Sequence, residues 1–121
     1  VNPEDVSVEV TVRKTGLQII VAAGGASRVI GDIPVVEGQQ NHKKLSEVLQ
    51  QVKKGFPDKK DLVLLPTPEI DYQTLVAIMD TARTYETVVA ASLVDAVLFP
   101  EVSLGDASAL NTPSNTEEVQ P

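Results

Sequence analysis

Residues 61–83 read DLVLLPTPEIDYQTLVAIMDTAR, and this stretch decides the predicted fold. It opens with a continuous apolar run at residues 62–65, bounded by Asp61 and Pro66, which is typical of a strand buried on both faces. Asp71 then stands where a helix N-cap is expected. An apolar stripe follows at helical spacing: Tyr72, Leu75, Val76, Ile78, Met79 and Ala82. The stretch therefore predicts a buried strand followed by an amphipathic helix that ends near Arg83.

The N-terminal part of the chain predicts three strands joined by short turns. Polar residues alternate there with four valines, Val6, Val8, Val10 and Val12. This period of two is typical of a strand with one buried face and one wet face. A turn at residues 14–16 leads to a second strand at residues 17–21, and a turn at residues 22–27 leads to a third, apolar segment at residues 29–36. Gly31 and Pro34 interrupt that segment and favour a short, bent or edge strand.

The middle of the chain predicts a second amphipathic helix. Asn41 is a suitable N-cap, Gly55 a suitable end, and the apolar residues between them keep helical spacing: Leu45, Val48, Leu49 and Val52. A β-branched run at residues 88–93 predicts a last strand. The predicted order is βββαβαβ. We therefore expect an α+β fold of two layers, in which a mixed sheet of about five strands packs against two amphipathic helices.

Length and composition set the expected organisation of the chain. The 121 residues suffice for one domain, which we place at residues 1–106. Residues 107–121 are too poor in large apolar side chains to offset the entropy of ordering, so we expect a disordered tail. The chain starts at Val1 and has no apolar run of about 18 residues, the length that a membrane helix needs. We expect that a preceding segment has been removed.

The composition disfavours several functional classes. The chain has no cysteine, so disulfides and thiolate metal sites are excluded. Its formal charge of −7 disfavours nucleic-acid binding, because phosphate contacts need a basic surface. With two Phe, two Tyr and no Trp, a platform for stacking bases is also not expected. We therefore predict no nucleic-acid partner.

The sequence contains no catalytic constellation. The only histidine, His42, lies beside Lys43 at a polar helix start and has no second ligand near it in the sequence. The acidic pairs Glu69/Asp71 and Glu117/Glu118 are interpreted as a turn with a helix cap and as part of the tail. The glycines lack the patterns of phosphate-binding loops, and no serine lies in a nucleophile elbow. We predict no catalytic residue, cofactor or metal, and hence no enzyme.

The basic residues are unevenly distributed. Six of the ten lie on or just after the first predicted helix, and they are Lys43, Lys44, Lys53, Lys54, Lys59 and Lys60. No basic residue follows Arg83. Lys43, Lys44, Lys53 and Lys54 form a candidate basic face for an anionic polymer or partner. The other interpretation, a solvated helix face without a partner, remains open.

Residues 56–83, FPDKKDLVLLPTPEIDYQTLVAIMDTAR, resemble the ExbD/TolR family of bacterial inner-membrane proteins. Members carry a similar run, in which a Phe-Pro-Asp-Lys turn leads to a strand and then to a Tyr-containing helix ending in Met-Asp-x-Ala-Arg. The matching positions are Phe56, Pro57, Asp58, Lys59, Tyr72, Met79, Asp80, Ala82 and Arg83. The likeness covers roughly residues 6–95, judged by the family order of turns and helices.

The resemblance implies the periplasmic domain of a single-pass stator subunit, used in biopolymer transport and driven by the proton motive force. It implies a homodimer that works with an ExbB/TolQ-like membrane subunit and acts on a TonB- or TolA-like protein or on peptidoglycan. The membrane helix of such a subunit is absent from this chain.

Exposed strand edges would suit this role, because an edge can bind a second copy or a partner peptide by strand addition. The candidate edge residues are Val6, Val8, Val10, Val12, Val88, Val89 and Leu93. A different class of function also agrees with the sequence. It is a ring-building or regulatory interaction domain of a secretion system, without a motor.

Overall fold

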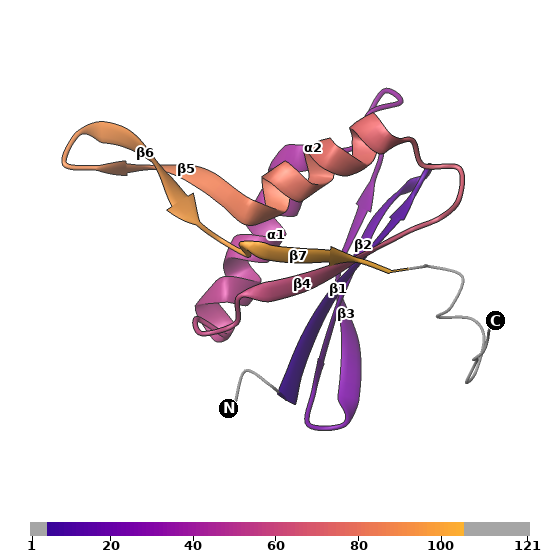
Figure 1. The fold of residues 1–121 in the computed structure, drawn as a ribbon, viewed down its shortest axis with the longest axis horizontal. Helices are drawn as coiled ribbons and strands as arrows, with labels where there is room; N and C mark the ends of the chain where they lie inside the picture. The colour runs from indigo at the N-terminus through magenta and orange to yellow at the C-terminus, as the bar shows by residue number, and fades with distance from the viewer. Residues whose placement is uncertain (1–4, 106–121) are drawn as a thin grey trace.

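The computed structural model describes residues 5–105 (Figure 1). The elements follow in the order β1 (Val6–Arg13), β2 (Gly16–Ala23), β3 (Ala26–Pro34), α1 (His42–Gly55), β4 (Asp61–Pro66), α2 (Tyr72–Arg83), β5 (Thr84–Val89), β6 (Ser92–Val97) and β7 (Glu101–Leu104). The tail expected at residues 107–121 lies outside the described residues.

The main sheet has five strands in the order β3-β2-β1-β4-β7. β1 pairs with β2 and β2 with β3 in antiparallel fashion, whereas β1 with β4 and β4 with β7 are parallel pairs. The sheet is therefore mixed, and the predicted α+β class is confirmed. β5 and β6 form a separate two-stranded antiparallel sheet.

The core lies between the main sheet and the two helices. Alternate side chains of β1, the valines at 6, 8, 10 and 12, are almost completely buried and belong to the same apolar cluster as Leu49 of α1 and Ile78 of α2. Phe99, between β6 and β7, is the largest fully buried side chain. Fully burying a Val, Leu, Ile or Phe side chain contributes about 1.5–3 kcal/mol, so this cluster is the main source of stability.

Both helix starts agree with the sequence prediction. The Asn41 side chain accepts a hydrogen bond from the Lys44 amide at the start of α1. Asp71 does the same for the Thr74 amide at the start of α2. One member of the predicted stripe is wrong, because Tyr72 lies in the first turn of α2 and points into solvent, with 77% of its surface exposed.

The prediction of an exposed edge at Val6, Val8, Val10 and Val12 is wrong. β1 is an interior strand that is hydrogen-bonded to β2 on one side and to β4 on the other. The alternation in the sequence correctly indicates one buried face. It carries no information about which strands lie on either side, and the parallel pairing with β4 covers the edge that the sequence left open.

The prediction of one strand at residues 88–93 is also wrong. β5 ends at Val89, Ala90 and Ala91 form a two-residue turn, and β6 begins at Ser92. Both alanines take left-handed φ angles, 52° and 64°, as a tight hairpin turn requires. The segment lacks the Gly or Asn that usually marks such a turn. The observed order has two strands more than predicted, β6 and β7.

No helix among residues 5–105 is both long and apolar enough to cross a membrane.

Candidate interaction surface

The β5–β6 hairpin projects away from the rest of the molecule (Figure 1). Within the described part of the chain its strands pair only with each other, in a register that sets Val88 opposite Leu93 and Glu86 opposite Asp95. Residues that lie opposite each other share one face of a sheet, and the faces alternate along the strand. One face of the hairpin, which we name the outer hairpin face, therefore carries Thr84, Glu86, Val88, Leu93, Asp95 and Val97.

The outer hairpin face is exposed along its whole length. Its large apolar side chains keep most of their surface in water: Val88 is 64% exposed, Leu93 71% and Val97 63%. The opposite face is different at its base, where Tyr85 and Ala96 are half-buried and Tyr85 packs against the core. The hairpin is thus attached to the domain on one face and open on the other.

Exposed apolar surface on a two-stranded hairpin is unfavourable in water. An isolated hairpin of this kind is at best marginally stable, and packing against another element is what normally stabilises it. A contiguous apolar patch on a projecting element is a common mark of a protein-interaction site. Of the predicted edge residues, Val88 and Leu93 lie together on the outer hairpin face, whereas Val89 lies opposite Ser92 on the other face. The four valines of β1 lie in the core instead.

β3 lies at an outer edge of the main sheet, which is one of the alternatives that Gly31 and Pro34 favoured in the sequence. β3 is the end strand of the sheet, and its pairing with β2 shifts by one residue, so that Ile19 lies opposite Gly31 and Ile20 opposite Val29. The extra residue is Ile30. A bulge of this kind, with Pro34 closing the strand, twists the edge and discourages the addition of a further strand.

An apolar groove of about 450 Å³ lies between the β2–β3 hairpin and the second half of α1. Its walls include Val21 and Ile30 from the strands and Val52 and Phe56 from the helical side. Arg28, on β3, also lines the groove. This groove was not predicted from the sequence. Its signal was the set of small residues Ala23, Ala26 and Gly55, which leave space where larger side chains would fill it.

A second, polar hollow of about 490 Å³ surrounds the starts of the two helices. His42, Glu69 and Asp71 all line it. The His42 Nδ1 atom lies 3.0 Å from the Thr81 hydroxyl, which itself donates to the Ala77 carbonyl. The Thr81 oxygen then accepts from Nδ1, so this ring nitrogen is used in holding α1 against α2.

The two acids of this hollow, Glu69 and Asp71, take part in local hydrogen bonds that favour their ionised forms. The Thr67 hydroxyl lowers the pKa of Glu69 by a hydrogen bond to its carboxylate, and Lys14 lowers it further. Hydrogen bonds from Thr74 lower the pKa of Asp71. A general acid needs a raised pKa, so neither group is tuned for proton donation. Within residues 5–105 no cluster of three or more His, Cys, Asp or Glu side chains could hold a metal ion.

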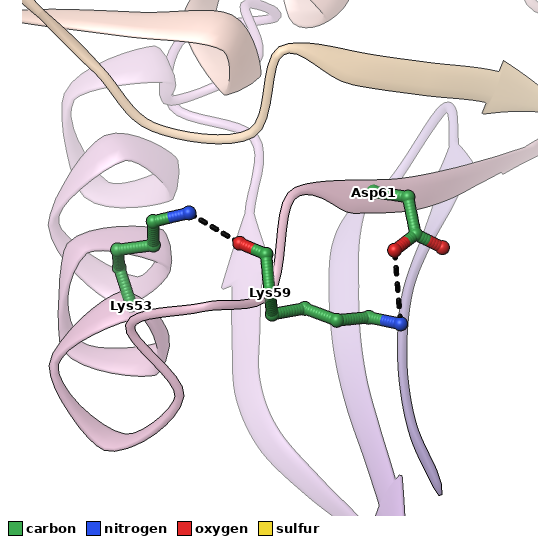
Figure 2. A network of polar contacts seen from close by, with 3 residues as sticks. All are labelled: Lys53, Lys59 and Asp61. Atoms are coloured by element: carbon green, nitrogen blue, oxygen red, sulfur yellow. Dashed lines mark hydrogen bonds and ion pairs between the residues drawn. The ribbon is translucent and has the colours of Figure 1, made fainter. Parts of the chain in front are cut away.

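The predicted basic face is not one continuous surface. Lys43 and Lys44 are exposed in the first turn of α1 and Lys54 in its last turn, about 15 Å away along the axis. Lys53 is half-buried and turned inward: its ammonium donates to the Lys59 carbonyl (Figure 2) and lies 5.0 Å from the centre of the Phe99 ring.

The contacts of Lys53 and Lys59 stabilise the fold. Burial lowers the pKa of Lys53, the charge of Lys60 lowers it further, and Asp58 partly opposes both. Lys59 is only 5% exposed, and its Nζ atom forms an ion pair with Asp61 at 3.0 Å (Figure 2). These lysines hold the end of α1 against the start of β4, so an anionic partner would meet separate charges here.

Comparison of the chain with family models, with curated proteins and with solved structures finds no match.

Proposed function

We propose that this chain is a protein-interaction domain of a proton-driven membrane motor, similar to the periplasmic domain of an ExbD/TolR stator subunit. The observation that carries the proposal is the outer hairpin face, where Val88, Leu93 and Val97 are mostly exposed on a projecting element. The stretch that resembles the family, residues 56–83, builds the turn before β4, β4 itself and α2. The resemblance therefore supports a fold shared with the family over these elements.

The order of strands suits a domain that transmits force. In the proposed protein the membrane segment precedes β1, so tension enters the domain through this strand. β1 is hydrogen-bonded on both sides, over its full length to β2 and over residues 9–12 to β4. A force along β1 then acts on the hydrogen bonds to β2 and to β4 at the same time, and extraction of the strand must break both sets together. A strand in this position resists extraction better than one at the edge of the sheet.

In this proposal the domain acts as a homodimer, and the full-length protein sits with an ExbB/TolQ-like subunit in the inner membrane. The outer hairpin face supplies contacts between proteins, and the load is a TonB- or TolA-like protein or peptidoglycan. No covalent chemistry is required of the chain. This agrees with the Asp71 carboxylate, which caps α2, and with a histidine ring nitrogen that joins two helices.

The test uses the full-length gene product in its own membrane. We expect it to co-purify with a pore-forming subunit. The variant Val88→Thr/Leu93→Thr, which places β-branched residues at both strand positions, should retain that complex and lose the work driven by the proton motive force. Tyr72→Ser is the matched control, because it removes an equally exposed side chain from α2.

Two outcomes would refute the proposal. One is a full-length protein that fractionates without the membrane and without a pore subunit. The other is a hairpin variant that supports work as well as the wild type does.

A further inference from the structure

We infer that the apolar groove between α1 and the β2–β3 hairpin receives the outer hairpin face from a second copy of this chain. The inference deepens the proposed function, and it rests on that proposal only in requiring that two copies of the domain meet. It joins two features that are each left without a partner among residues 5–105, a projecting apolar hairpin and an apolar groove.

The first argument is the match in polarity. The end of the outer hairpin face nearest the turn presents Val88 and Leu93 as a directly opposed pair, both largely exposed. The groove offers them aliphatic and aromatic walls, among them Val21, Val52 and Phe56. Its volume of about 450 Å³ falls in the range of sites that take up a bound group. Seating the pair there removes apolar surface from water on both copies.

The second argument is charge. Glu86 and Asp95 lie directly opposite each other on the outer hairpin face, next in line after Val88 and Leu93. Like charges in this position repel, so the face favours a partner that brings a cation. Arg28 lines the groove, is exposed, and forms no ion pair with another described residue. A hairpin whose apolar tip enters the groove brings its two carboxylates toward this guanidinium.

The same charges argue against a symmetric contact between two hairpins. If the outer hairpin faces of two copies met, two Glu86 and two Asp95 side chains would be brought together without a basic residue from either hairpin, since none follows Arg83. Repulsion between four carboxylates opposes that arrangement. The groove, lined by Arg28 and free of acidic side chains, is the better acceptor on this chain.

The contact is tested by paramagnetic broadening between copies. Because the chain has no cysteine, Leu93→Cys gives a single attachment point for a nitroxide label. The labelled, ¹⁴N copy is mixed with an equal amount of ¹⁵N wild type at about 1 mM, high enough to populate a weak contact. We expect broadening of wild-type amides around Arg28 and Ile30 and along the second half of α1. A label at Tyr72→Cys, at the far end of α2 from the hairpin, should leave these amides sharp.

A charge exchange gives an independent readout of the same contact. Arg28→Glu should weaken self-association about two- to five-fold, the effect of one partly exposed ion pair, and Glu86→Lys in the same chain should restore it. Amide spectra of each variant verify that the domain stays folded. If Arg28→Glu leaves the association constant unchanged, the charge pairing is refuted.

The remaining outcomes are equally decisive. Broadening confined to hairpin amides of the ¹⁵N copy would replace the inference by a contact between hairpins. Broadening elsewhere, or none at all, would overturn it. Such a failure is separate from a failure of the proposed function, because association with a pore subunit and membrane work are measured on the full-length protein and do not depend on where the hairpin binds.

Discussion

Asp71 shows how a single side chain serves the structure. Its carboxylate accepts a hydrogen bond from the Thr74 amide, 2.9 Å away, at the start of α2, and hydrogen bonds from Thr74 lower its pKa. A lowered pKa in the folded state means that the unfolded chain binds the proton more readily. The ionised cap therefore contributes its full stability at pH values above the ordinary carboxyl pKa. This contribution is lost as the pH falls through the pKa that Asp71 has in the folded state.

The first prediction follows from the downward shift of the Asp71 pKa. Asp71→Asn keeps an oxygen acceptor for the cap and removes the titration. Between about pH 6 and pH 3, the wild type should lose stability relative to Asp71→Asn as the pH falls. Urea denaturation at each pH measures the difference. Asn41→Ala at the cap of α1 is the control, with a loss of about 1 kcal/mol that does not depend on the Asp71 titration. A constant difference between wild type and Asp71→Asn across this pH range would contradict the account.

The second prediction concerns Phe99, the largest fully buried side chain. Its ring packs in the core and lies under the Lys53 ammonium. Phe99→Ala should lower the free energy of unfolding by about 3–5 kcal/mol, through lost burial and a residual cavity. Tyr72→Ala, on the exposed surface of α2, should change it by less than about 0.5 kcal/mol. Equal effects of the two changes in urea denaturation would show that the core is not where the structure places it.

For single residues, the helix N-caps could be predicted from the sequence, whereas the burial of a charged lysine could not. Asn41 and Asp71 act within three residues of themselves, so local sequence is enough to identify them. Lys59 is buried because the chain turns back between α1 and β4 and pairs it with Asp61. That burial depends on tertiary packing, and in the sequence Lys59 is only one of six lysines on or just after the first helix.

Among the elements, the two hairpin turns form a matched pair. Gly24 and Gly25 join β2 to β3 with φ angles of 62° and 82°, and Ala90 and Ala91 join β5 to β6 with 52° and 64°. Glycine adopts this conformation without strain, whereas a residue with a Cβ atom pays about 1–2 kcal/mol for it. The β5–β6 hairpin is therefore held in shape at a cost that the β2–β3 hairpin avoids.

The third prediction concerns variants in which the two hairpin turns exchange their residue types, glycine-containing for alanine and alanine for glycine-containing. Ala90→Asn/Ala91→Gly should stabilise the hairpin by about 1 kcal/mol, which slows exchange of its hydrogen-bonded amides about five-fold. Gly24→Ala/Gly25→Ala should destabilise the β2–β3 turn by a similar amount. An added Cβ meets no atom within 4 Å at either glycine, so the cost comes from the backbone alone. Hydrogen exchange followed by NMR measures both, and faster exchange in the Asn-Gly variant would refute the assigned turn.

Element types could mostly be derived from the sequence, because β1 and both helices have a clear period and glycine-containing turns separate β1, β2 and β3. The β5–β6 turn could not, since Ala90 and Ala91 carry no turn signal and β-branched residues continue on both sides. β7 was missed for a related reason. It spans only Glu101–Leu104, too short for a period, and it is a strand because it pairs with β4.

For the whole molecule, the class of fold was predictable and the arrangement of strands was not. The order βββαβαβ indicated a mixed sheet under two helices, which the structure confirms. The interior position of β1 depends on its pairing with β4, some fifty residues away, and no local pattern encodes it. The candidate surface was therefore half predicted, with the hairpin residues found and the β1 residues misplaced.

The fourth prediction separates stability from association. Val88→Thr/Leu93→Thr replaces apolar side chains that lie in water, so the free energy of unfolding should change by less than about 0.5 kcal/mol. Leu64→Ala, at a fully buried position of β4, should cost about 2–5 kcal/mol in the same urea titration. If the double variant proved as damaging as Leu64→Ala, the hairpin residues would belong to the core and not to an interface.

The central claim is that two copies of this domain associate through the outer hairpin face. Sedimentation equilibrium of the 121-residue chain, from about 10 µM to about 1 mM, tests it most directly. The wild type should associate as its concentration rises, and Val88→Thr/Leu93→Thr should associate at least about ten-fold more weakly. Wild-type chains that stay monomeric throughout, or a double variant that associates as strongly as the wild type, would contradict the claim.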